Sequence, residues 1–286
     1  MKFFSIITLF VVIFSSCQKD FSVENNINND LTTITDSSYV DKIVYIDSSG
    51  TRLDSLMYNY DIQKRLISIF DSSSSSNYNI KNFLYSGNDT LPFKVVETNK
   101  TISSGFFKTT KYFSYNTIGL LIKDSCIRIF QPSDTSVRVG NYTYNGNKIF
   151  GITYDTGFSQ KTIWVDTATL DIAKNIVFSK RKKIFDLNNF SSYPDSSKSK
   201  ITYDNKIGAF AKFKQFAHDI FPNGETSFFE IGQNNNVLIM DEYIYYGFFT
   251  YPYTYDFNAL YVYNINGLPK QISGNDEKFI FYYKNF

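Results

Sequence analysis

The segment that decides the fold is Tyr58-Asn59-Tyr60-Asp61-Ile62-Gln63-Lys64-Arg65-Leu66-Ile67-Ser68-Ile69. Its opening residues alternate, which places Tyr58 and Tyr60 on one face of a pleated strand. The polar gap that follows begins with Asp61, and across the copies of this pattern Asn, Asp and Gly residues in the gap supply the positive-φ positions that a hairpin turn needs. The aliphatic run after the gap then returns antiparallel, so the segment predicts a β-hairpin.

The same arrangement recurs along the chain. Its second aromatic residue falls at positions 60, 85, 115, 144, 203 and 263. The successive intervals of 25, 30, 29, 59 and 60 residues are close to one or two units of about 29 residues. The chain is therefore built from repeated hairpin units.

A unit of two strands cannot bury its apolar face alone, so neighbouring units must stack edge to edge. Aromatic residues make up 19% of the chain, and all but one of them are Tyr or Phe. Cross-strand pairs of rings in a sheet explain this high content. We predict an all-β fold, an antiparallel meander of repeated hairpins that forms one large twisted sheet or a barrel.

One stretch interrupts the strand pattern. Between residues 205 and 221, apolar residues recur at three- and four-residue spacing, Asp204 or Asn205 can cap a helix, and Pro222 can end it. We therefore expect one amphipathic helix near 205–221.

Two of the copies resemble a known repeat. Tyr58-x-Tyr60-Asp61-x-x-x-Arg65-Leu66 and Tyr261-x-Tyr263-Asn264-x-x-Gly267-Leu268 are similar to the YD (Rhs-type) repeat, Tyr-x-Tyr-Asp-x-x-Gly-Arg-Leu. The repeat is degenerate, since Lys64 stands where Gly is usual. Together with the amino-terminal motif described next, it resembles Bacteroidota outer-membrane lipoproteins of unknown function.

The amino terminus resembles a lipoprotein signal. Lys2 is followed by an apolar run, Phe3 to Phe14, that is shorter than the roughly 20 residues of a membrane-spanning helix. Ser15-Ser16-Cys17 is similar to the bacterial lipobox, which implies that residues 1–16 are removed and that Cys17 is lipidated. The alternative is a plain signal peptide, with Cys17 an ordinary thiol.

We expect three regions: a signal peptide at 1–16, a lipidated Cys and flexible tether at 17–39, and one β-repeat domain at 40–286. The Asn-rich run at 24–30 has no apolar period and suits a tether. The implied location is the outer membrane, with the domain facing the periplasm or the cell surface.

Composition excludes several function classes. A net charge of +2 and a pI near 8.2 offer no basic stripe for nucleic acid. Cys126 lacks an activating base and is expected to be a buried small apolar residue. His218 is the only His, so no His or Cys cluster can hold zinc. We predict no catalytic residue, metal or cofactor.

A binding role is the first hypothesis. The segment 243–255 is dense in aromatic residues, more than one strand face can bury, and exposed rings can stack on sugars or on a partner's rings. The candidate surface consists of Tyr243, Tyr245, Tyr246, Phe248, Tyr251, Tyr253 and Tyr255. We expect a membrane-anchored, non-enzymatic binding or scaffold module for a glycan or envelope protein. The alternatives are a glycan-binding accessory or glycan-processing enzyme, and a partner subunit docked to an outer-membrane barrel or secretion machine.

Overall fold

The computed structural model of the protein describes residues 38–74, 77–101, 105–130, 134–157, 160–186, 196–209, 211, 235–245, 253–274 and 277–286. The chain divides into two units, Met1–Ser38 and Tyr39–Phe286, and the fold below is that of the second. The predicted signal peptide and tether lie outside the described residues, apart from Ser38 and Tyr39, which begin the first strand.

The described residues form seventeen β-strands and no α-helix. The strands are β1 (Ser38–Ile46), β2 (Arg52–Tyr60), β3 (Leu66–Ser74), β4 (Asn77–Leu84), β5 (Lys94–Thr101), β6 (Gly105–Tyr115), β7 (Leu121–Phe130), β8 (Asp134–Asn145), β9 (Lys148–Gly157), β10 (Gln160–Leu170), β11 (Ile176–Asp186), β12 (Ser196–Ile207), β13 (Asn235–Tyr245), β14 (Tyr253–Asn258), β15 (Leu260–Tyr263), β16 (Pro269–Gly274) and β17 (Glu277–Asn285).

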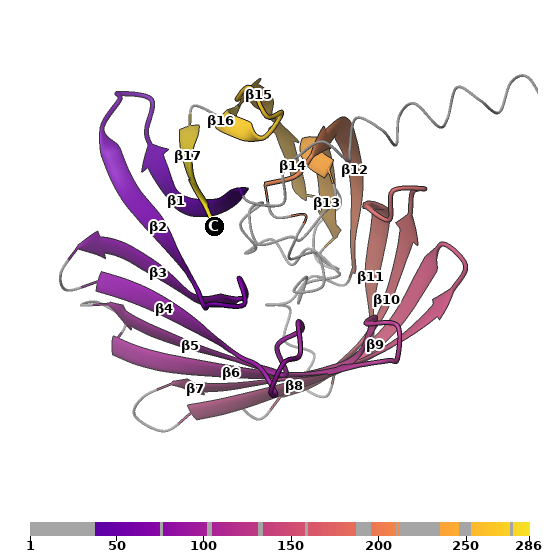
Figure 1. The fold of residues 1–286 in the computed structure, drawn as a ribbon. Helices are drawn as coiled ribbons and strands as arrows, with labels where there is room; N and C mark the ends of the chain where they lie inside the picture. The colour runs from indigo at the N-terminus through magenta and orange to yellow at the C-terminus, as the bar shows by residue number, and fades with distance from the viewer. Residues whose placement is uncertain are drawn as a thin grey trace, which may run out of the picture. The chain divides into compact units, whose positions relative to one another are not determined.

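All seventeen strands belong to one sheet, in which chain neighbours pair antiparallel (Figure 1). β14 pairs with β13 and β15 pairs with β16, and only Ala259 separates β14 from β15. β1 pairs with β2 and also with β17, where Lys284 and Asp41 form an ion pair at 3.0 Å. The predicted fold class, an all-β antiparallel meander in one large sheet, is confirmed.

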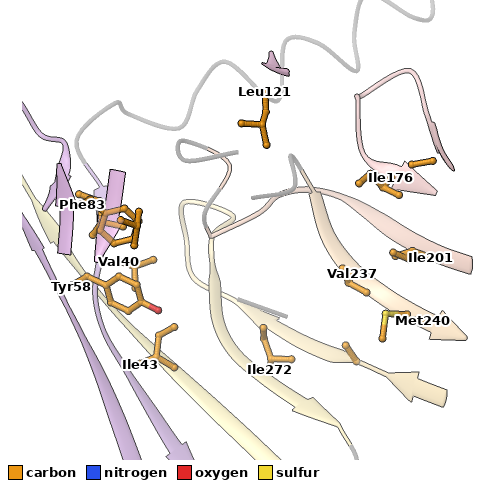
Figure 2. Close-up of a cluster of buried hydrophobic side chains, with 14 of the residues drawn as sticks. Val40, Ile43, Tyr58, Phe83, Leu121, Ile176, Ile201, Val237, Met240 and Ile272 are labelled. Carbon is orange, nitrogen blue, oxygen red and sulfur yellow. The ribbon is translucent and has the colours of Figure 1, made fainter. Parts of the chain in front are cut away.

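One face of the sheet, the inner face, carries the hydrophobic core. The core includes Tyr58, Phe83, Phe113, Tyr142 and Ile272, all of which are buried. Figure 2 shows core side chains projecting from strands at both ends of the chain, among them Val40 and Ile43 of β1 and Ile272 of β16. The repeated hairpins therefore share a single core, as a unit too small to bury its own face requires.

The predicted start of the helix near 205–221 is wrong. β12 remains extended to Ile207, which pairs with Asn235 of β13. The Asp204 carboxylate accepts hydrogen bonds from the Lys206 backbone N–H and from the Tyr263 hydroxyl, so it does not cap a helix. Strand pairing overrides the local three- and four-residue spacing in this place. Residues 210 and 212–221 lie outside the described residues.

Four turns at one edge of the sheet share one geometry. In the first, the Asp61 N–H donates to the Arg65 carbonyl at 3.0 Å, and the Arg65 N–H donates to Asp61 Oδ1 at 2.9 Å. The fourth residue of each turn has positive φ: Lys64 (62°), Gly119 (80°), Lys174 (67°) and Gly267 (74°). Lys64 and Lys174 therefore adopt the left-handed conformation that Gly119 and Gly267 adopt in the other two turns.

The turn at 171–175 is a hairpin unit that the repeat analysis missed. Asp171 accepts from the Asn175 N–H at 2.8 Å, as Asp61 does from Arg65. The residue before it is Leu170 and not an aromatic residue, which hid the unit. It falls within the 59-residue gap between Tyr144 and Tyr203.

Candidate functional site

The recurring tyrosines share one interaction beside the turns. The hydroxyls of seven tyrosines donate to backbone carbonyls of neighbouring strands or connections at 2.6–3.2 Å. We call them the tyrosine row: Tyr60, Tyr85, Tyr115, Tyr144, Tyr203, Tyr261 and Tyr283. Five of the six positions predicted from the sequence belong to this row. At the sixth, Tyr263 donates to Asp204, and Tyr261 takes the equivalent place.

Burial raises the pKa of every member of the tyrosine row, and for Tyr144 it does so to about 12. The ionised phenolate would be buried away from water, and without its proton it could no longer donate a hydrogen bond to the backbone carbonyl. The row is therefore neutral at physiological pH and acts as a structural element.

Farther along the same face lies the charged row: Asp124, Arg138, Asp155, Asp166 and Arg181. Arg138 Nη2 lies 3.1 Å from Asp124 Oδ2, and Arg181 Nε lies 2.7 Å from Asp166 Oδ1. Asp124 and Asp166 have at most 1% of their surface exposed. These are charge-assisted hydrogen bonds between fully buried carboxylates and partly buried guanidinium groups.

Neutral side chains complete the coordination of the two buried aspartates. The Tyr142 hydroxyl donates to Asp124 Oδ1 at 3.0 Å, and the Thr153 hydroxyl donates to Asp166 Oδ2 at 2.9 Å. The Arg181 guanidinium also lies 5.5 Å from the centre of the Trp164 ring. The lone pairs of both carboxylates are thus engaged by fixed donors, which suits a rigid framework more than a reactive acid or base.

Asp155 differs from the other two aspartates. Burial raises its pKa, and the charges of Arg128, Arg138 and Arg181 act in the opposite direction. Glu242 on β13 is also buried, and burial raises its pKa. Asp155 lies on β9 and Glu242 on β13, two strands that do not pair with each other, so no acid–base pair is assigned.

The opposite face of the same strands, the outer face, has a different character. On β9, Phe150, Ile152 and Tyr154 each expose more than two fifths of their surface. Ile152 pairs with Val165 of β10, and Tyr154 pairs with Ile163. We call these five residues the outer patch. Cross-strand partners share a face, so the patch is continuous across two strands.

Lysines adjoin this patch. Lys182 of β11 pairs directly with Val165, and Lys180 pairs with Lys198 of β12. We call Lys180, Lys182, Lys198 and Lys200 the basic stripe, because all four take outer-face positions on β11 and β12. Lys180, Lys182 and Lys200 are exposed.

The predicted aromatic surface is divided in the structure. Tyr243 and Tyr245 lie on the outer face of β13, and Lys198 Nζ lies 5.0 Å and 5.6 Å from their ring centres. Tyr253 pairs with Ile244, which places it on the other face, where it is exposed. Tyr255 belongs to β14, while Tyr246, Phe248 and Tyr251 lie outside the described residues. Binding at this surface stays a prediction.

The remaining sequence candidates are placed as follows. Cys126 is buried and free, as expected for a small core residue. Cys17 and His218 lie outside the described residues. Within the described ranges, no three His, Cys, Asp or Glu side chains are grouped to hold a metal ion. That part of the chain also contains no helix able to cross a lipid bilayer.

Sequence reasoning missed the charged row and the basic stripe. The only available signal was the alternation of charged and apolar residues within individual strands, such as Ile163-Trp164-Val165-Asp166 on β10. That signal does not say which face is buried or which strand supplies the partner.

Comparison with known proteins finds a shared fold without a shared family. The chain resembles a porin-like protein from Bacteroides vulgatus ATCC 8482, with a TM-score of 0.51 and 14% identity over 86% of this chain and 99% of that one. A porin-like protein from Bacteroides uniformis ATCC 8492 gives a TM-score of 0.47 and 12% identity over 86% and 98% of the two chains. No protein-family model and no curated protein matches the sequence.

Proposed function

We propose that the protein is an outer-membrane-associated envelope lipoprotein whose sheet domain is a non-enzymatic binding module. The lipobox-like Ser15-Ser16-Cys17 supports a lipid anchor on Cys17. The porin-like description of the Bacteroides vulgatus neighbour and the resemblance to Bacteroidota lipoproteins with YD repeats support the outer membrane.

The binding surface is the outer face of β9 to β13. The observation that carries this proposal is continuity: the apolar outer patch borders the basic stripe, and Lys198 of the stripe contacts Tyr243 and Tyr245. Aromatic and apolar groups beside cations match a partner that presents apolar and acidic side chains. We assign such an envelope protein as the partner.

The lysines favour a protein partner over the lipid interior at this face. Each lysine on the lipid-facing side of a membrane-spanning sheet costs about 2–4 kcal/mol at the bilayer midplane. Lys180, Lys182 and Lys200 are exposed on neighbouring strands. A partner with acidic groups would offset their charge.

The anchor is tested by fractionation. Cys17→Ala should release the protein from the membrane into the soluble periplasmic or medium fraction. Unchanged membrane fractionation of this variant would refute acylation as the means of attachment. Protease treatment of intact cells would then assign the wild-type domain to the periplasm or the cell surface.

The binding surface is tested by charge reversal in the anchored protein. The triple variant Lys180→Glu, Lys182→Glu, Lys200→Glu should lose partners captured by chemical cross-linking in cells. Lys108→Glu, Lys270→Glu, Lys278→Glu is a matched control, since these three lysines are also exposed but lie on β6, β16 and β17, outside the proposed surface. Equal loss in both variants, or in neither, would contradict the assignment of the surface.

A second candidate function, glycan binding, is favoured by the position of Lys198 between Tyr243 and Tyr245. Tyrosine rings stack on sugar faces, and the ammonium group suits an acidic sugar. An array of neutral and acidic glycans, probed with wild type and with Tyr243→Ala, Tyr245→Ala, tests it. Binding that persists in the variant would exclude this surface, and released sugars would indicate an enzyme.

A further inference from the structure

Four turns at one edge of the sheet each present an isoleucine to solvent. The turns at 61–65, 116–120, 171–175 and 264–268 form the turn edge. Their isoleucines expose between 77% and 102% of their reference surface: Ile62, Ile118, Ile172 and Ile265. An exposed isoleucine thus recurs at the tips of four turns. Exposed apolar residues that need no explanation are scattered over the surface and do not recur at equivalent positions.

The four turns lie at the same edge because every second connection of an antiparallel meander returns to it. Contacts between neighbouring connections agree: Arg65 Nη1 donates to the Gly87 carbonyl at 2.7 Å, and the Asn147 carbonyl accepts from the Leu170 N–H at 2.8 Å. The turn edge is therefore one continuous feature of the fold.

Two of these tips combine the isoleucine with an outward cation. Asp61 and Asp171 turn their carboxylates toward their own turns, where Arg65 and Asn175 donate to them. Lys64 and Lys174, the fourth residues of these two turns, are exposed. The tips thus present apolar side chains and cations, while these two acidic groups are satisfied internally.

The chain enters the domain at this same edge. Tyr39, near the start of β1, packs against Tyr60 with ring centres 5.3 Å apart, and Tyr60 directly precedes the first turn. Residues 18–37 separate Cys17 from Ser38, and these 20 residues can span at most about 70 Å. An anchor on Cys17 would therefore tether the domain to the membrane through this edge.

We infer that the turn edge contacts the phospholipid bilayer to which Cys17 is attached. The four isoleucines enter the head-group region, and Lys64 and Lys174 meet anionic head groups. This inference rests on the proposed lipid anchor. It directs the strands away from the bilayer and leaves the outer face of β9 to β13 accessible to a partner.

A fluorescence experiment on the lipidated full-length protein tests the contact. In a Trp164→Phe background, which removes the only Trp, Ile172→Trp is compared with Ile184→Trp in vesicles of phosphatidylglycerol and brominated phosphatidylcholine. Ile184 is also exposed but lies eight residues beyond the start of β11, roughly 26 Å along the strand. Bromine should quench only the probe at position 172, by roughly twofold.

A second measurement keeps Trp164 and does not need the anchor. Co-sedimentation of the Cys17→Ala protein with vesicles of phosphatidylethanolamine and phosphatidylglycerol is compared with that of a quadruple variant: Ile62→Ser, Ile118→Ser, Ile172→Ser, Ile265→Ser. Its partitioning should fall by about tenfold or more. The control replaces four exposed apolar strand residues, by Ile129→Ser, Ile184→Ser, Ile239→Ser and Leu260→Ser, and should bind like the parent.

The outcomes separate the two proposals. Lipidated protein that is bound to vesicles, with no quenching at position 172, supports the anchor and overturns the turn-edge contact. Greater loss of binding in the control than in the turn variant also overturns it, in favour of the outer face. Protein that does not bind through Cys17 refutes the anchor and this inference with it.

Discussion

The tyrosine row and the charged row lie on the same face of one sheet but are built in different ways. Each member of the tyrosine row donates to a backbone carbonyl, an acceptor that every residue provides. In the charged row, Asp124 and Asp166 need particular side chains on neighbouring strands, namely Arg138 and Arg181. The first row repeats in the sequence, and the second does not.

The difference has a physical origin. A hydroxyl aimed at backbone tolerates substitutions in the neighbouring strand, so the same tyrosine serves in each hairpin unit. A buried ion pair fails when either partner changes, because the remaining charge is left without compensation. The two rows should therefore respond differently to pH and to mutation.

High pH should give the largest effect, through the tyrosine row. Burial raises the pKa of its members above the ordinary value of about 10, so between pH 10 and about 12 the unfolded chain loses protons that the folded chain keeps. The contribution of these tyrosines to stability is then constant below pH 10 and falls above it by about 1.4 kcal/mol per pH unit for each tyrosine. Circular dichroism should show unfolding together with tyrosinate absorbance. Tyr144→Phe should flatten the fall by one tyrosine, and a fall of unchanged slope in this variant would contradict the burial argument.

Breaking one charged pair should give the next largest effect. Asp166→Ala removes the buried carboxylate that accepts from Arg181 and Thr153 and should cost about 3–5 kcal/mol in urea unfolding. The control is Asp41→Ala, which removes the more exposed pair with Lys284 and should cost about 0–1 kcal/mol. Equal costs would show that burial does not distinguish the two pairs.

Filling the space beside the charged row should cost less. Gly140 pairs with Asp124, and a Cβ at this position would collide with the Asp124 carboxylate and the Tyr142 hydroxyl. Gly140→Ala should destabilise by about 1–3 kcal/mol in the same assay. Tyr142→Phe removes one colliding atom together with a hydrogen bond to Asp124, so in a double-mutant cycle the two substitutions should cost less together than the sum of their separate costs if this steric account is correct.

The turns beside the tyrosine row should give the smallest change, and one of opposite sign. Lys64 and Lys174 hold a left-handed conformation that disfavours residues with a Cβ. Lys64→Gly or Lys174→Gly should stabilise by about 0.5–1 kcal/mol, as measured by thermal unfolding. Gly267→Ala, with φ of 74°, should destabilise by a similar amount. Destabilisation by the glycine variants would disprove the strain.

Particular residues show how far sequence analysis reached. Alternation and turn chemistry predicted the hairpin around Asp61 because both act within about ten residues. The unit at 171–175 was missed because Leu170 lacks the aromatic signature, although its turn is the same. The helix start failed because the pairing of Ile207 with Asn235 depends on residues 28 positions away.

The candidate site was less accessible. Sequence density in aromatic residues singled out Tyr243 and Tyr245, and the structure adds the lysine between them. The lysines of the basic stripe come from two strands, and two lysines in one strand give no signal of a charged surface. Only strand pairing makes them neighbours of the outer patch.

By itself the sequence determined the all-β class, the repeated hairpins and most of the tyrosine row, because alternation, turn residues and backbone acceptors are local or uniform properties. Tertiary structure alone decided the charged row and the composition of the outer face. Register shifts, such as those between Ser114 and Tyr115 and between Ile163 and Trp164, change which residues share a face. Since one such step exchanges the two faces of a strand, partners on different strands follow only from the assembled sheet.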